Sequence, residues 1–119
     1  MNTVELLRRA VAELKTNGWI QGDYRDSTGR HCAVGAVEDV LREEFGPGSA
    51  GESDEGRFAS DPKALNLFEN AVAVLDRAAS KDGYDGIVNL NDSDGTDFAK
   101  VRSAFTRAIS LAKSSSVGA

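Results

Sequence analysis

The stretch from Gly18 to Val37 constrains the fold more than any other, because it concentrates residue types that the chain uses rarely. It holds the only Trp, the only His, the only Cys and one of the two Tyr, namely Trp19, His31, Cys32 and Tyr24. It closes on a run of small residues, Cys-Ala-Val-Gly-Ala, that opens a helical pattern. Small side chains let another backbone or a large ring approach a helix closely. We therefore interpret this stretch as the joint on which the other elements pack.

Apolar residues at helical spacing predict four helices. Their expected spans run from Asn2 or Thr3 to about Lys15, from about Cys32 to Phe45, from Pro62 to about Ala79, and from Thr96 or Asp97 to about Lys113. The predicted fold is mainly all-α: a compact bundle of about four helices joined by two structured polar loops, at residues 18–32 and 84–96. A short β-ribbon near residues 19–32 is the one candidate for extended structure.

The same periodicity predicts which faces are buried. Glu13 on the first helix, and Glu38 and Asp39 on the second, fall outside the apolar stripes and are expected to face water. The third helix is apolar nearly all round, which predicts that it is the central one. Gly35 lies inside the second helix, where Gly costs up to about 1 kcal/mol relative to Ala. Close packing against another backbone or against the Trp19 ring is the expected reason for this glycine.

Length and charge limit the classes of protein. The 119 residues are expected to form one domain, 1–119, with a loose loop at about 46–60 and a frayed end at 114–119. A net charge of −5 disfavours binding to nucleic acid or to an anionic membrane. A single Cys cannot form an internal disulfide, the charged start is not that of a signal peptide, and no window approaches the ~18 apolar residues of a membrane span. These features predict a cytoplasmic protein.

A candidate catalytic pair lies at the predicted start of the second helix. The helix dipole and a neighbouring imidazolium both lower the pKa of a thiol, which favours a reactive thiolate. If the protein is an enzyme, Cys32 would be the nucleophile, His31 the base and Asp92 the group that orients the base. The alternative is that Cys32 is a small buried hydrophobe. Adjacent side chains usually point apart, so His31 need not face the thiol.

The acidic loop 89–97 is a candidate calcium site that fails the spacing test. With Gly95 at the sixth position of an EF-hand loop, Leu90 and Val101 occupy the first and twelfth positions, where carboxylates are required. Turn and helix-cap chemistry is the alternative role for its Asn and Asp residues. One Cys and one His cannot supply a structural zinc site, and the G-x-G-x-x-G at 46–51 follows a helix rather than a strand. A looser Ca²⁺ or Mg²⁺ site in the loop 89–97 is left as an alternative, and the sequence otherwise predicts no bound metal and no cofactor.

Three segments occur in a fixed order: W-I-Q-G-D-Y at 19–24, C-A-V-G-A at 32–36 and N-D-S-D-G at 91–95. Together they resemble an uncharacterised family of small actinobacterial and actinobacteriophage proteins, whose W-x-Q-G-x-Y, C-A-x-G-A and N-D-x-x-G motifs they match. Leu90 stands where the family often has Trp, and Thr96-Asp97 where it tends to have Arg-Thr. Any role of that Arg would be missing here. The resemblance implies origin and fold rather than an activity.

The two polar loops supply the candidate binding residues: Trp19, Gln21, Tyr24, Arg30, Asn91 and Asp92. We expect Gln21, Tyr24 and the Asn91-Asp92 pair to meet, either as a structural hydrogen-bond network or around a ligand. Arg30 flanks a tight turn, where it would present its guanidinium to an anion or pair with a nearby Asp.

The leading interpretation is a small cytosolic, non-enzymatic interaction or regulatory protein, encoded by a phage or mobile element and acting on a host protein. No complete catalytic set is present in the sequence, and the acidic residues predict a basic partner surface. One alternative is a cysteine-dependent enzyme. Another is a small-ligand or metal binder formed by the loops 18–32 and 84–96. A homodimer is a further option, because the third helix would leave apolar surface uncovered.

Overall fold

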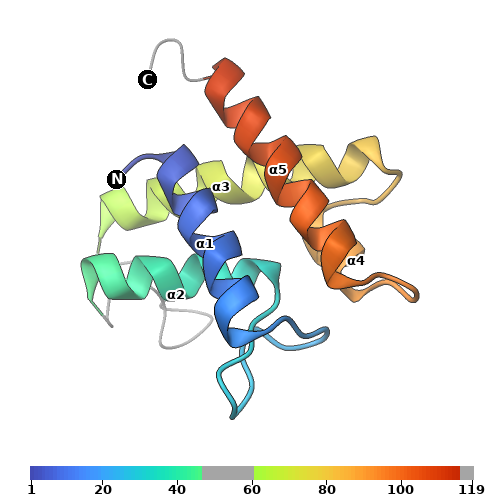
Figure 1. Cartoon of the computed structure of the whole chain (residues 1–119). Helices are drawn as coiled ribbons and strands as arrows, with labels where there is room; N and C mark the ends of the chain where they lie inside the picture. Colours follow the sequence, from blue (N-terminus) through green and yellow to red (C-terminus); the bar gives the residue numbers. More distant parts are fainter. Residues whose placement is uncertain (47–60, 116–119) are drawn as a thin grey trace.

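The structure, a computed structural model, describes residues 1–46 and 61–115. These residues form five helices: α1 (Thr3–Asn17), α2 (Ala33–Phe45), α3 (Pro62–Lys81), α4 (Ile87–Asp92) and α5 (Phe98–Ser115). α1 and α5 contact each other and cross over α2 and α3 (Figure 1). The prediction of a mainly all-α bundle is confirmed. The expected loose loop and frayed end fall almost entirely outside the described residues.

Local signals in the sequence set the starts of three helices. Asn2 Oδ1 accepts a hydrogen bond from the backbone N–H of Glu5 at 2.8 Å and so caps α1. Asp61 Oδ1 caps α3 in the same way through the N–H of Lys63 at 2.9 Å, and Pro62 occupies the first turn. Cys32 caps α2 with its sulfur. α1, α3 and α5 each continue a little past their predicted last residue.

The short helix α4 was not predicted, because residues 84–95 were interpreted as irregular. The backbone N–H of Ile87 at its start donates to Asp76 Oδ1 of α3 at 2.8 Å. A Cβ at Gly86 would lie 2.8 Å from the same oxygen. Ile87 and Leu90 are both fully buried. This helix therefore depends on a side chain from a distant element, which no local pattern shows.

The predicted β-ribbon is reduced to two isolated bridges in the described part of the chain. Both involve His31, which pairs with Trp19 and with Arg25. The backbone N–H of His31 donates to the carbonyl of Gly18 at 3.1 Å, and the N–H of Ile20 donates to the carbonyl of His31 at 3.0 Å. These bonds close the segment 18–32 into a folded loop.

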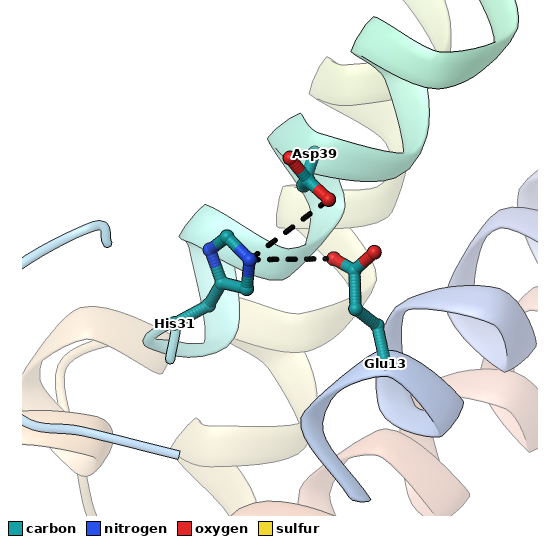
Figure 2. A group of neighbouring side chains, drawn as sticks. All are labelled: Glu13, His31 and Asp39. Carbon is teal, nitrogen blue, oxygen red and sulfur yellow. Dashed lines mark ion pairs between the residues drawn. The ribbon is translucent and has the colours of Figure 1, made fainter. Parts of the chain in front are cut away.

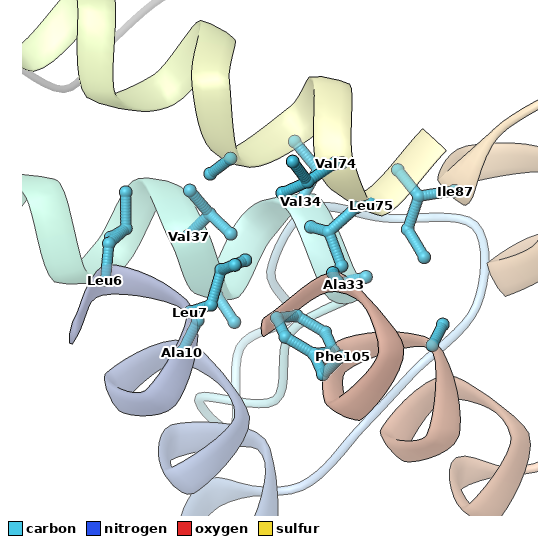
Figure 3. Packing of buried hydrophobic residues seen from close by; sticks show 14 of the residues in the cluster. Leu6, Leu7, Ala10, Ala33, Val34, Val37, Val74, Leu75, Ile87 and Phe105 are labelled. Carbon is cyan, nitrogen blue, oxygen red and sulfur yellow. The ribbon is translucent and has the colours of Figure 1, made fainter. Parts of the chain in front are cut away.

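The core lies where α1, α2, α3 and α5 meet. Phe105 of α5 is the largest fully buried side chain. It points toward Leu7 of α1, Ala33 of α2 and Leu75 of α3 (Figure 3). All three of these residues are fully buried as well.

Of the helices that the structure describes, none is both long and apolar enough to cross a bilayer.

α3 contacts each of the other four helices, as expected of a central helix, but the prediction that it is the most buried one is wrong, because α2 is. Leu65 on α3 is 37% exposed, so α3 keeps a solvent face. On α2, by contrast, every residue from 33 to 38 is buried, including Glu38 at 4% exposure. The expectation that Glu38 faces water is therefore also wrong. The reason is that α1, α3, α4 and the loop 18–32 all contact α2 from different directions.

Gly35 on α2 is required by a close approach of the loop 18–32. A Cβ at this position would lie 1.8 Å from the carbonyl oxygen of Tyr24 and 2.7 Å from its carbonyl carbon. Real Cβ atoms do not approach backbone so closely. The predicted role of Gly35 in close backbone packing is thus what the structure shows, and the partner is Tyr24.

We expect Gly35→Ala to lower the free energy of unfolding by about 1–3 kcal/mol or more, because the loop or the helix must move to admit the methyl group. The intrinsic helix propensity of Ala works in the opposite direction by about 1 kcal/mol. Urea denaturation measures the net change. Asn70→Ala, at an exposed position of α3, is the control in which only propensity changes. A Gly35→Ala variant as stable as the wild type would contradict the close contact.

Candidate functional site

The side-chain amide of Asn91 joins the two polar loops to the start of α2. Asn91 is 2% exposed. Its Oδ1 accepts hydrogen bonds from Trp19 Nε1 at 2.7 Å and from the backbone N–H of Ala33 at 3.0 Å. Its Nδ2 donates to the carbonyl of Ile20 at 3.2 Å and to Asp92 Oδ1 at 2.8 Å. All four hydrogen bonds that an amide can readily make are therefore made.

Neighbouring residues strengthen this junction. Gln21 Nε2 donates to the backbone carbonyls of Asn91 at 3.0 Å and Ser93 at 2.9 Å. Asp92 Oδ1 also accepts from the N–H of Gly22 at 2.9 Å. The structure thus brings Trp19, Gln21, Asn91 and Asp92 together, as a hydrogen-bond network. Their binding of a ligand stays a prediction.

Arg30 lies apart from this network. Its Nε pairs with Asp26 Oδ2 at 2.7 Å. Asp26 Oδ1 accepts from the N–H and hydroxyl of Thr28 and from the N–H of Arg30. Arg30 therefore closes the turn at 26–30, which is the pairing with a nearby Asp that the sequence offered as an alternative.

Tyr24 lines a small cavity beside the junction. The cavity has a volume of about 120 Å³, and its walls include Tyr24, Cys32, Val34, Val88 and Asp92. Tyr24 is 45% exposed and Val88 is 53% exposed, although both are large and largely apolar. A wider and more open hollow of about 570 Å³ adjoins it and shares Val88 and Asp92. The residues that line the two hollows include Asp23, Asp76, Asp85 and Asp92, with no Lys or Arg among them.

Cys32 has the environment of a core residue rather than of a nucleophile. The residue is 8% exposed, and its sulfur accepts a hydrogen bond from the N–H of Gly35 at 3.3 Å. Burial raises the pKa of the thiol above its ordinary value, which disfavours the thiolate. Within the described residues, the polar partners of the His31 ring are Tyr24, Glu13 and Asp39. The geometry therefore does not assemble Cys32, His31 and Asp92 into a nucleophile, base and orienting acid.

The ring of His31 faces two carboxylates (Figure 2). His31 Nδ1 donates to the carbonyl of Tyr24 at 3.2 Å, since a carbonyl can only accept. His31 Nε2 lies 3.7 Å from Glu13 Oε2 of α1 and 3.9 Å from Asp39 Oδ2 of α2. Both distances exceed hydrogen-bond length. Asp39 Oδ1 accepts from Arg42 Nη1 at 3.1 Å.

Sequence reasoning missed Glu13 and Asp39, which were both expected to face water. Instead the side chains are only 11% and 22% exposed. The one available signal was their position beside the apolar stripes, next to Leu14 and Val40. That signal does not reveal that the two helices cross at this point, or that His31 turns toward them.

Burial is the main reason that Glu13 holds its proton. Burial, together with the nearby Asp39 and Glu43, raises the pKa of Glu13 to about 9. In the described part of the chain, Glu13 Oε2 is buried without a hydrogen-bond partner. At neutral pH Glu13 is therefore the neutral acid, in contact with an imidazole and a second carboxyl group.

We expect Asn91→Ala to lower the free energy of unfolding by about 2–6 kcal/mol, since it orphans the N–H groups of Trp19 and Ala33 at about 1–3 kcal/mol each. Urea denaturation followed by Trp19 fluorescence measures the loss. Asn89→Ala is the matched control, because Asn89 is exposed on the same short helix and should change stability by less than about 0.5 kcal/mol. Equal stabilities of the two variants would show that the network is dispensable.

We expect the stability of the wild type to fall as pH rises from the ordinary Glu value of 4.5 to about 9, because the folded chain then binds one more proton than the unfolded chain. Glu13→Gln cannot titrate and should lack this slope. The Glu13→Gln variant should match the free energy of unfolding of the wild type at the acid end of this range. At the alkaline end it should exceed the wild type by at least about 1.4 kcal/mol, which corresponds to one pKa unit. Parallel stability curves for the two proteins would refute the raised pKa.

Comparison with protein-family models matches residues 1–111 to the family described as "Family of unknown function (DUF6197)". The matched range covers α1 to α4 and most of α5. It includes every residue of the Asn91 network, of the cavity beside Tyr24 and of the cluster of Glu13, His31 and Asp39. No curated protein and no solved structure matches the chain. Because the match covers nearly the whole chain, the protein belongs to this family of unknown function.

Proposed function

We propose that this chain is a small non-enzymatic interaction protein that binds a protein partner through one face. We call it the Tyr24–Val88 face and define it by the exposed residues Tyr24, Val88, Asp23, Asp85 and Asp92 together with the partly buried Asp76. The observation that carries the proposal is that two of the few large apolar side chains exposed in the described residues line the same cavity. Contiguous exposed apolar surface beside a hollow is typical of an interaction site.

The size of the cavity favours a single apolar side chain as the group it receives. An apolar cavity of about 150 Å³ is large enough to bind benzene. A volume of about 120 Å³ therefore suits one aliphatic or aromatic side chain rather than a cofactor. Val34 and Val88 supply apolar walls, and the ring of Tyr24 offers a flat surface with a polar tip.

The surrounding charge favours a basic partner segment. The two hollows are lined by Asp23, Asp76, Asp85 and Asp92, without a balancing Lys or Arg among their lining residues. Such a surface attracts Lys and Arg and speeds association with them at low ionic strength. Binding should therefore weaken as salt is added.

The proposed origin of the protein rests on the family resemblance, and its proposed location rests on its composition. The motifs at 19–24, 32–36 and 91–95 support an actinobacterial or actinobacteriophage gene, and hence a partner that is a protein of the bacterial host. The single Cys and the acidic composition support a cytoplasmic site of action. The cysteine-enzyme alternative is less favoured, because it requires an accessible thiolate and Cys32 is buried with a raised pKa.

A displayed library of random peptides tests the proposed partner chemistry directly. We expect the wild type to select peptides in which one large apolar residue is flanked by Lys or Arg. The double change Tyr24→Ser and Val88→Ser should lower the affinity for those peptides at least about tenfold, as expected when anchor side chains of an interface are removed. Leu65→Ser is the matched control, because it removes another exposed apolar side chain, on α3.

Charge variants test the proposal that the partner segment is basic. Asp23→Asn with Asp85→Asn removes two exposed carboxylates that make no structural cap in the described contacts. This variant should bind the selected peptides more weakly and with a smaller salt dependence. Far-ultraviolet circular dichroism checks that each variant is folded. Selection of acidic or purely polar peptides, or equal affinity for wild type and the Tyr24→Ser, Val88→Ser variant, would exclude the Tyr24–Val88 face as the binding surface.

A further inference from the structure

We propose that Glu13, His31 and Asp39 form a binding site for a divalent transition-metal ion, with Zn²⁺ as the best-fitting ion. The three residues come from α1, the loop 18–32 and α2, and their ligand atoms all lie within 4.8 Å of one another. Each presents one ligand atom to the same point: Glu13 Oε2, His31 Nε2 and Asp39 Oδ2 (Figure 2). This site goes beyond the proposed partner binding and does not depend on it.

The distances fit an ion placed between the three atoms. Zinc binds imidazole nitrogen and carboxylate oxygen at about 2.0–2.2 Å, so two tetrahedral ligands lie about 3.3–3.4 Å apart. The observed separations of 3.7 Å and 3.9 Å from His31 Nε2 are slightly longer than this. They are too long for hydrogen bonds, so hydrogen bonding to the carboxylates does not account for the position of His31 Nε2. Small rotamer adjustments of Glu13 and Asp39 would bring both oxygens onto the ion.

His31 is prepared as a ligand by the contact on its other nitrogen. Its side chain is 5% exposed, and Nδ1 donates to the carbonyl of Tyr24 at 3.2 Å. In the neutral ring this donation leaves Nε2 with its lone pair directed at the two carboxylates. A histidine that binds a metal almost always donates its second ring N–H to a carbonyl or carboxylate in this way, which fixes the tautomer and the ring orientation.

The carboxylates show the same preparation. Asp39 Oδ1 accepts from Arg42 Nη1 at 3.1 Å, which orients the side chain and leaves Oδ2 toward His31. Glu13 Oε2 is buried and has no hydrogen-bond partner in residues 1–46 and 61–115. Buried polar atoms normally have a partner, so one that lacks a protein partner marks a place where an ion or a water can bind. A metal ion would satisfy Glu13 Oε2 and His31 Nε2 together.

The donor set selects the class of metal. One imidazole nitrogen with two carboxylate oxygens suits Zn²⁺ and its first-row neighbours. Calcium takes six to eight oxygen ligands, and magnesium prefers oxygen ligands in an octahedral arrangement, so neither matches a site built around an imidazole. Three protein ligands leave a fourth zinc position for water.

Protons compete with the metal for this site. The groups that face Glu13 are His31 from the loop and Asp39 and Glu43 from α2, and Arg42 pairs with Asp39. Burial and the two acidic neighbours raise the pKa of Glu13, so the ion must displace a proton to bind. Metal affinity should therefore increase as pH rises toward about 9, the pKa of Glu13. Without metal, the neutral Glu13 would only share its proton with the neighbouring carboxylates of Asp39 and Glu43.

The test uses the full chain after treatment with a chelator, and adds Zn²⁺ alone. We expect one Zn²⁺ to bind per chain, measured by competition with a chromogenic chelator, and to raise the melting temperature. Glu13→Gln and Asp39→Asn should weaken binding at least about 100-fold, the upper end of the loss seen for groups that merely support a ligand. Glu5→Gln is the matched control, because it removes an exposed carboxylate from the same helix. Co²⁺ should give visible absorption bands in the wild type that are lost in Glu13→Gln.

Glu13→Gln makes the test independent of folding. Because Glu13 is the neutral acid in the folded protein, Gln preserves its shape and charge state, and the variant should stay folded. Three results would overturn the proposal: no effect of Zn²⁺ on the melting temperature at any pH up to about 9, equal Zn²⁺ affinity of Glu13→Gln and Glu5→Gln, or stabilisation by Ca²⁺ as large as that by Zn²⁺. The first result, combined with higher stability of Glu13→Gln at alkaline pH, would leave proton sharing as the role of the cluster.

Discussion

The structure depends on one buried amide. The loop 18–32 has no strand ladder in the described chain to satisfy its backbone, and Asn91 from α4 replaces part of that ladder. The same amide accepts the indole N–H of Trp19 and the first backbone N–H of α2. A carboxylate could not donate to the carbonyl of Ile20, and an apolar side chain could satisfy none of these groups. Asn is therefore the residue type that holds two polar loops and two helices in one arrangement.

The carbonyl of Tyr24 is a second constraint. It links the Tyr24–Val88 face to the cluster of Glu13, His31 and Asp39. It occupies the space that Gly35 leaves by lacking a Cβ, and it accepts the hydrogen bond from His31 Nδ1. The side chain of the same residue lines the cavity and is 45% exposed. One short segment thus supplies a surface contact through its side chain and orients a buried imidazole through its backbone. A shift of this segment would change both sites together.

The cluster of Glu13, His31 and Asp39 is not what stability alone would favour at this position. Partly burying several ionisable groups is unfavourable, and apolar residues of similar volume are often at least as stable. Perturbed titratable groups gather at functional sites for this reason. Cys32 presents the opposite case: its sulfur caps α2 and its thiol is buried, so its rarity in the sequence reflects packing. In this chain the cluster is accordingly a stronger candidate for a functional site than Cys32.

Local signals in the sequence determined the helices. Asn2 and the Asp61-Pro62 pair set the starts of α1 and α3, and Gly18, with φ of +107°, ends α1. Such signals act within one turn of a helix, so they can be identified without knowing the fold. The need for close packing at Gly35 and the meeting of the two polar loops were also predictable, because rare and small residues gather there.

Only the tertiary structure decided the rest, because it depends on contacts between distant elements. α4 forms where Asp76 of α3 caps Ile87, and α2 rather than α3 is the more buried helix because α1, α3, α4 and the loop 18–32 cover it. Glu13 and Asp39 meet at His31 only because α1 crosses α2 at that level. Helical periodicity shows which residues share a face, but the angle and offset at which two helices cross come from the packing of all the elements at once.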